Sequence, residues 1–167
     1  MPVTSSGKAK VTLPTDEQIL IEREFDAPKH LVYKALTTPE LINRWWHAKR
    51  GEVTLAEIDL RVGGKWRYVM VADEGGGVGF HGEYRELVPN ERIVWTEIYE
   101  GLPEGVSEEE GGTVNTATLT ETDGRTTLTI LIQASNKIAR DAIIESGMEA
   151  GLQDAFDLLE EVAVSLR

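Results

Sequence analysis

One long apolar stripe near the C-terminus constrains the fold of this chain more than any other feature. Apolar residues after Asn136 recur at steps of three and four, which places them on one face of a helix. The stripe comprises Ile144, Met148, Gly151, Ala155, Leu159, Val162 and Leu166, widened by Leu152, Phe156 and Ala163. Acidic residues, Glu160 among them, occupy the other faces. We predict one helix over residues 137–165, about 40 Å long at roughly 1.5 Å per residue, with Glu160 at its surface.

Seven segments before this helix alternate apolar and polar residues with a period of two, which is typical of β-strands. They are QILIEREF (18–25), VTLAEIDL (53–60), GGKWRYVMV (63–71), GFHGEYRELV (79–88), RIVWTEIY (92–99), TVNTATLTE (113–121) and RTTLTILIQA (125–134). Turn signals separate them, and Asp123-Gly124 between the last two is a strong hairpin signal. Two short helices are expected after the first strand, within residues 29–36 and 37–46.

These elements predict an α+β fold in which a curved seven-stranded antiparallel sheet wraps around the long C-terminal helix. One face of such a sheet must be covered, and no other predicted element is large enough to cover it. The chain has no internal repeat and no second domain. We expect residues 1–12 to form a flexible tail and residues 13–167 to form a single domain.

The composition argues against several classes of function. The chain has 29 acidic and 17 basic residues, a formal net charge of −12, so it lacks the basic surface that binds nucleic acid or a membrane. It has no cysteine, which excludes disulfides and thiolate catalysis. It also has no apolar run of about 18 residues and no secretory signal, so we expect a cytoplasmic protein.

Motifs for catalysis, metals or cofactors are weak. Gly77, Gly79 and Gly82 have the spacing G-x-G-x-x-G, but the segment continues as a strand instead of opening a helix. The three histidines are scattered without ligand spacing, and no G-x-S-x-G elbow is present. We predict no catalytic residue, no metal site and no cofactor. His81 faces outward if Phe80 faces the core, although a bulge near the neighbouring glycines would reverse this.

The aromatic residues are more informative. Trp66 and Tyr68 share one strand face, Phe80 and Tyr84 share a face of the next strand, and Trp95 follows on another. They form either a plain sheet core or, because several have polar tips, the wall of a cavity. The predicted cavity residues are Trp46, Trp66, Tyr68, Phe80, Tyr84, Trp95, Glu97, Met148, Leu152 and Phe156.

Several neighbouring positions leave alternatives open. Gly147 and Gly151 indicate either close approach of helix and sheet or room for a ligand. Arg23, on an apolar strand face, is expected to pair with a carboxylate across the sheet, or else to anchor a ligand. Trp45 and Trp46 are adjacent, so they cannot both lie on the same narrow apolar face of a helix. We expect Trp45 in the core and Trp46 near the cavity mouth. The candidate carboxyl groups for acid/base chemistry are Glu97, which is expected to share a strand face with Trp95, and Glu86, which is expected to share one with Tyr84.

Four stretches resemble a known family: FDAPKHLVYKALTTPELINRWW, DLRVGGKWRYVM, FHGEYRELVPNERIVWTE and SGMEAGLQDAFDLL. They are similar to activator-of-heat-shock-protein-ATPase homologues, in the START-like SRPBCC superfamily. The resemblance runs from about Leu13 to Leu166 and implies a helix-grip fold like that of the birch pollen allergen. The acidic, glycine-rich loop at 99–115 departs from the expected family pattern.

The resemblance and the residues together favour a non-enzymatic domain that binds a small hydrophobic or aromatic molecule between sheet and helix. A co-chaperone-like interaction module is one alternative, as the family name implies. Chaperone activators of the family act through an additional N-terminal domain, for which this chain is expected to have no room. A cyclase or hydratase that uses acid/base residues in the cavity is the other alternative.

Overall fold

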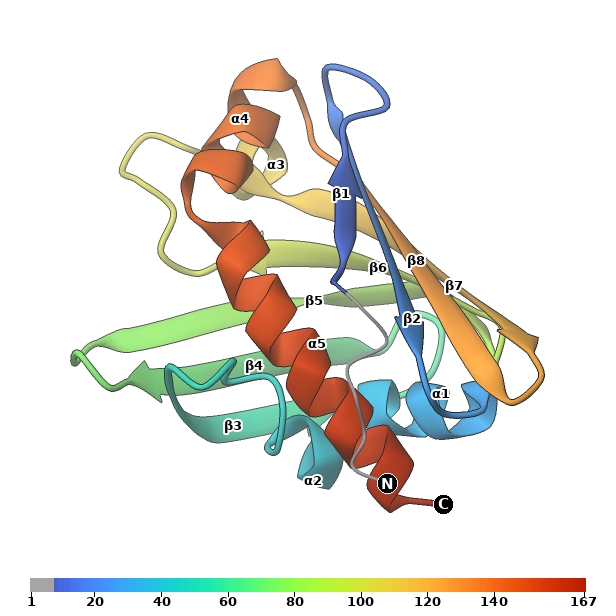
Figure 1. Cartoon of the computed structure of the whole chain (residues 1–167). Helices are drawn as coiled ribbons and strands as arrows, with labels where there is room; N and C mark the ends of the chain where they lie inside the picture. Colours follow the sequence, from blue (N-terminus) through green and yellow to red (C-terminus); the bar gives the residue numbers. More distant parts are fainter. Residues whose placement is uncertain (1–7) are drawn as a thin grey trace.

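An eight-stranded antiparallel sheet is the framework of the protein (Figure 1). The structure, a computed structural model, describes residues 8–167. The strands are β1 (Lys10–Thr12), β2 (Gln18–Phe25), β3 (Gly51–Ile58), β4 (Lys65–Ala72), β5 (Gly77–Val88), β6 (Arg92–Tyr99), β7 (Thr113–Thr122) and β8 (Arg125–Gln133). Their order across the sheet is β1-β2-β8-β7-β6-β5-β4-β3.

The seven predicted strands are all present, and the additional one is β1. This strand pairs with β2, Val11 opposite Ile21, and it lies inside the range 1–12 predicted as a flexible tail. Three residues are too few to establish a period of two, so the sequence pattern did not reveal it. Residues 1–7 of the predicted tail lie outside the described residues.

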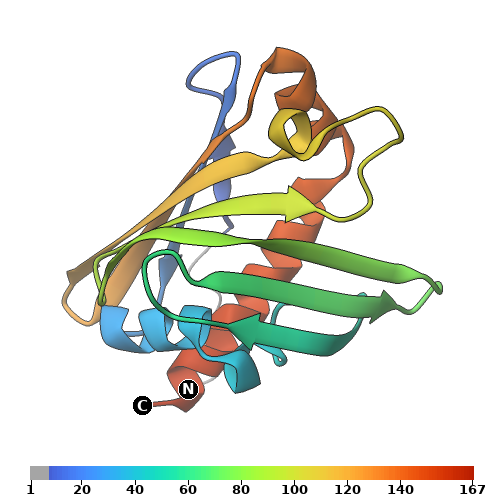
Figure 2. The same cartoon turned by 180° about the vertical axis from the view of Figure 1, so that it is seen from behind.

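Five helices are present in the described part of the chain, mostly near the two ends of the sheet (Figures 1 and 2). They are α1 (Lys29–Thr37), α2 (Pro39–Ile42), α3 (Glu108–Gly111), α4 (Lys137–Glu145) and α5 (Met148–Ser165). The prediction of one helix over 137–165 is wrong. The helix is interrupted at Gly147, whose φ of +82° lies in the left-handed region that favours glycine.

Helix α5 lies across the curved sheet and contributes most of the apolar stripe to the core, as a helix-grip fold requires (Figure 1). Phe156 meets Phe25 of β2 edge to face at 5.8 Å between ring centroids, and Leu159 is fully buried. Helix α1 packs on α5 and closes that end of the core with Val32 and Ala35. The other end of α5, from Met148 to Phe156, faces the middle of the sheet.

Arg23 pairs with carboxylates of helix α5, not with a carboxylate across the sheet as predicted. Its Nη2 lies 2.7 Å from Asp157 Oδ1 and 3.3 Å from Glu160 Oε1. Glu160 also accepts the backbone N–H of Asp26 at 2.7 Å and is only 1% exposed. The expectation that Glu160 lies at the surface is therefore wrong, because the helix presents this acidic side chain to a buried arginine.

Candidate ligand cavity

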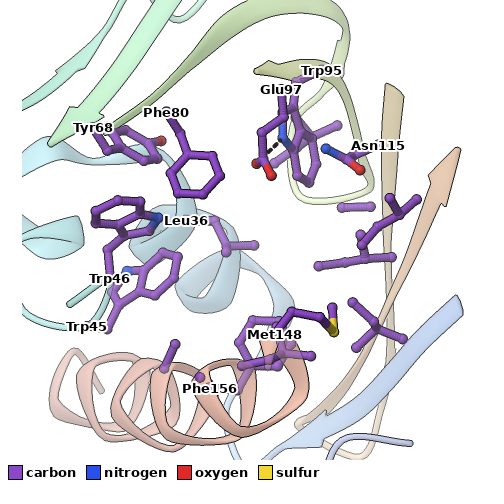
Figure 3. A pocket seen from close by; sticks show the side chains of 18 of the residues that line it. Leu36, Trp45, Trp46, Tyr68, Phe80, Trp95, Glu97, Asn115, Met148 and Phe156 are labelled. Atoms are coloured by element: carbon purple, nitrogen blue, oxygen red, sulfur yellow. Dashed lines mark hydrogen bonds between the residues drawn. The ribbon is translucent and has the colours of Figure 1, made fainter. Parts of the chain in front are cut away.

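A cavity of about 380 Å³ lies between the sheet and the first half of α5 (Figure 3). The ten residues that the sequence predicts for a cavity all line it. It is also lined by Ile21, Leu36, Trp45, Ala48, Ile93, Asn115, Ala117, Ile130, Ile132, Gly151 and Ala155. Strands β4 to β8 provide most of one wall and α5 provides the opposite wall, so the cavity depends on the helix crossing the sheet.

Aromatic rings form a continuous cluster on one side of the cavity. Trp46 contacts Tyr68 and Phe80 edge to face, with centroid separations of 5.6 and 5.8 Å. Trp66 lies 4.8 Å from Tyr68, and its indole N–H donates to the Thr96 carbonyl at 3.2 Å. Edge-to-face and tilted contacts of this kind are the favourable arrangements for aromatic rings, so the cluster keeps its shape without a ligand.

Gly82 explains how Trp66 reaches across the sheet. A Cβ atom at this position would lie 1.8 Å from the Thr96 carbonyl oxygen and 2.8 Å from Trp66 Nε1. Any side chain at position 82 would therefore displace the hydrogen bond. Because the glycine is needed for this close approach in a strand, the G-x-G-x-x-G spacing requires no nucleotide-binding interpretation.

The two adjacent tryptophans have different environments. Trp45 is buried, and its indole N–H donates to the carbonyl of Ala35 in α1 at 2.9 Å. Trp46 is half-buried and stands against the aromatic cluster. The core position of Trp45 agrees with the expectation, but Trp45 also contributes to the cavity wall.

Two tyrosine hydroxyls interact inside the cavity. Burial raises the pKa of Tyr68 well above its ordinary value, and the Tyr84 hydroxyl beside it raises it further. Burial likewise raises the pKa of Tyr84 to about 12. Both hydroxyls therefore stay protonated near neutral pH and can donate as well as accept hydrogen bonds.

Glu97 and Asn115 form a second polar region. Burial raises the pKa of Glu97, an effect that the hydrogen bond from the Trp95 indole N–H at 3.4 Å partly offsets. Asn115 is 2% exposed and donates through Nδ2 to Thr113 Oγ1 at 3.2 Å. Both side chains are on the cavity face, near Trp95 and away from Trp46 (Figure 3).

Glu86, the other candidate carboxyl group, lies outside the cavity. A bulge between Tyr84 and Glu86 shifts the register of β5 against β6, so these two residues no longer share a face. Glu86 instead accepts from Arg92 at 3.0 Å. The prediction that Glu86 faces the same side as Tyr84 is wrong because a period of two is lost at a bulge.

His81 faces away from the cavity, beside Glu100 on the outer side of the sheet. Its Nδ1 lies 2.8 Å from Glu100 Oε2, and Arg67 makes two 2.8 Å hydrogen bonds to the same carboxylate. The Arg67 guanidinium, together with His81, lowers the pKa of Glu100 to about 2. This cluster is a surface ion-pair network. Among the described residues, no group of three or more His, Asp or Glu is arranged to hold a metal.

Asn115 is the functional candidate that the sequence analysis missed. It alternates with Ala117 and Leu119, which face inward, whereas the neighbouring Val114 is exposed. A polar residue in phase with the apolar face of a strand is the signal that identifies it. The many threonines of that strand obscure which of its faces is buried.

Residues 26–163 match the sequence profile of the family described as Activator of Hsp90 ATPase homolog 1-like protein. A solved structure from Rhodobacter sphaeroides is 24% identical over 95% of this chain and 99% of that chain, with a TM-score of 0.85. One from Nitrosomonas europaea is 25% identical over 92% and 97% of the two chains, with a TM-score of 0.79. A third, from Chromobacterium violaceum, is 27% identical over 89% and 98%, with a TM-score of 0.76.

A search of curated proteins found no match. The solved structures therefore support the fold, and the residues of the cavity carry the argument about function. Between residues 8 and 167, every helix is too short or too polar to cross a membrane.

Proposed function

The chain belongs to the Activator of Hsp90 ATPase homolog 1-like family, and we propose that it binds a small apolar or aromatic molecule in the cavity between sheet and α5. The observation that carries this proposal is the cavity itself. Protein interiors are close-packed and contain few voids larger than a water molecule. A volume of about 380 Å³ lies in the range of small-molecule pockets, which span about 300–1,000 Å³.

The lining has the composition expected for such a pocket. All four tryptophans of the chain line it, together with Tyr68, Phe80 and Tyr84. Binding sites for small molecules are mostly apolar and aromatic, with a few polar groups that fix orientation. The tyrosine hydroxyls, Glu97 and Asn115 are groups of the second kind.

Fluorescence titration with N-phenyl-1-naphthylamine, a neutral aromatic probe, tests the proposal. Because every tryptophan lines the cavity, a bound probe should quench tryptophan emission by energy transfer and saturate at one site per chain. Absence of a saturable change in the wild-type signal would contradict the proposal.

Gly151 offers a way to fill the cavity without disturbing the fold. A Cβ atom added there meets nothing within 4 Å, and the residue lies on the cavity face of α5. The open space around this position leaves room for a larger side chain. Gly151→Leu should therefore weaken probe binding by about tenfold or more, because the side chain occupies the volume of the ligand. Gly151→Ala is the matched control and should bind nearly as the wild type does.

A further inference from the structure

Glu97 is a cavity carboxyl group without a cationic neighbour on the cavity wall. Among the described residues that line the cavity, none is lysine, arginine or histidine. Its hydrogen bond from Trp95 is long, at 3.4 Å, and uses only one of the two carboxylate oxygens. Glu97 is partly buried, and burying a carboxylate without a positive partner is costly, so Glu97 favours the arrival of a positive charge or a proton.

Asn115 is a polar neighbour of Glu97 in the cavity wall. Its Nδ2 is used by Thr113 Oγ1, whereas its buried Oδ1 has no hydrogen-bond partner among the described residues. An unsatisfied buried polar atom destabilises the folded protein. This oxygen is enclosed by the protein, so Glu97 is the acceptor of this region that a ligand can reach.

The strand register brings the two acceptors to one place. Trp95 of β6 is directly opposite Asn115 of β7, and Glu97 is directly opposite Thr113. Glu97 and Asn115 are therefore diagonal neighbours on the same sheet face, a separation of roughly 7–8 Å between backbone positions. Figure 3 shows both side chains beside Trp95, on the other side of the cavity from Trp46 and Tyr68.

We propose that the cavity selects an amphipathic ligand whose head is a protonated amine, which donates hydrogen bonds to Glu97. Its apolar or aromatic body lies against the cluster of Trp46, Tyr68 and Phe80. This inference rests on the proposed binding function and specifies the class of ligand. The net charge of −12 favours the approach of a cation and opposes that of an anion.

Other head groups satisfy this region less completely. A carboxylate would add a second negative charge beside Glu97. An alcohol can donate one hydrogen bond but carries no charge, whereas an ammonium group has three N–H donors and a full positive charge. Charge-assisted hydrogen bonds are stronger than neutral ones.

Isothermal titration calorimetry at neutral pH with three probes of one shape tests the inference. The probes are 2-(1-naphthyl)ethylamine, 2-(1-naphthyl)ethanol and 1-naphthylacetate. The amine should bind at least about tenfold more tightly than the alcohol, and the acetate should bind most weakly. This comparison uses the wild-type protein, so it does not depend on how any variant folds.

Glu97→Gln, which keeps the size of the side chain, should weaken amine binding by about tenfold or more and leave alcohol binding nearly unchanged. Glu86→Gln removes the same charge outside the cavity and should change neither amine binding nor alcohol binding. Equal affinities for amine and alcohol, with no effect of Glu97→Gln, would overturn the inference while the binding function stands. If no probe binds, the binding function and the inference both fail.

Discussion

Glu97 and Glu160 both face the interior of the protein, but their partners differ. Glu160 faces a buried arginine and a backbone N–H, and it connects β2 to α5. Glu97 faces an apolar cavity and receives one long hydrogen bond from an indole. At the residue scale, the partners of a charge in the interior decide whether it stabilises the fold.

Glu97→Gln should stabilise the ligand-free protein at pH 7. Because burial raises the pKa of Glu97 in the folded state, the stability that depends on its proton is fully present below the ordinary value of 4.5 and is lost as pH rises through the folded pKa. The amide stays neutral and avoids that loss. The titratable groups that face Glu97 in the cavity, Tyr68 and Tyr84, stay neutral throughout this range.

Urea denaturation of both proteins at pH 7 and at about pH 4 measures the difference, which should shrink at the lower pH. Glu86→Gln is the control, since its carboxyl group is at the surface. A constant difference at both pH values would mean that the desolvation of Glu97 is not its cause.

Glu160→Ala should cost about 3 kcal/mol, the lower end of the range for breaking a buried ion pair, because Asp157 still faces Arg23. Glu161→Ala next to it removes the same group from an exposed position and should stay within about 0.5 kcal/mol. Chemical denaturation compares the two variants. Similar losses would show that the arginine–glutamate contact contributes nothing beyond a surface charge.

At the scale of elements, two glycines one turn apart in the sequence have different roles. Gly147 has a φ of +82° and separates α4 from α5, whereas Gly151 lies within α5 and lines the cavity. Neither has an atom within 4 Å of an added Cβ, so space does not distinguish them. Their backbone conformations distinguish them, because Gly147 has a positive φ and Gly151 does not.

Gly151→Ala should therefore stabilise the protein by about 0.5–1 kcal/mol, because alanine is the better helix former. Gly147→Ala should destabilise it by about 1–2 kcal/mol, because an L side chain is strained in the left-handed region. Thermal unfolding of the two single variants measures both changes in stability, the expected increase for Gly151→Ala and the expected decrease for Gly147→Ala. If Gly147→Ala were also stabilising, a continuous helix over 137–165 would become the better description in solution.

Periodicity predicted these elements well wherever the chain is regular. The seven strands, the covering helix and the aromatic cavity wall all follow from repeats of two or of three and four. Two errors lie where a repeat is interrupted, at the bulge before Glu86 and at Gly147. A third is strand β1, whose three residues are too few to show a repeat. Glu160 is a different case, because its burial depends on Arg23, a partner from a distant strand. Local patterns carry no information about such a partner.

At the scale of the whole molecule, the formal net charge of −12 should make stability depend on salt. Repulsion between like charges opposes the compact state. Salt shortens the range of this repulsion from about 30 Å at 0.01 M to about 10 Å at 0.1 M. Most ion pairs here involve exposed side chains, which contribute little each, so screening of the repulsion should dominate.

The melting temperature should thus rise by a few degrees between about 0.01 and 0.1 M salt, since about 1 kcal/mol corresponds to about 2–4 °C for a protein of this size. Differential scanning calorimetry in sodium chloride and in choline chloride checks this. Equal rises in both salts identify screening, whereas a rise in sodium alone would indicate ion binding. A fall in both would mean that attractive pairs outweigh the repulsion.

The division of the cavity wall between sheet and helix has an evolutionary consequence. Every cavity residue on α5 is apolar or glycine, and the carboxyl, amide and hydroxyl groups all come from strands. Under the proposed binding function, substitutions on the helix should change how large a molecule fits, and substitutions at the polar strand positions should change which head group is accepted. A descendant of this protein would then be able to alter ligand size while retaining the preferred head group.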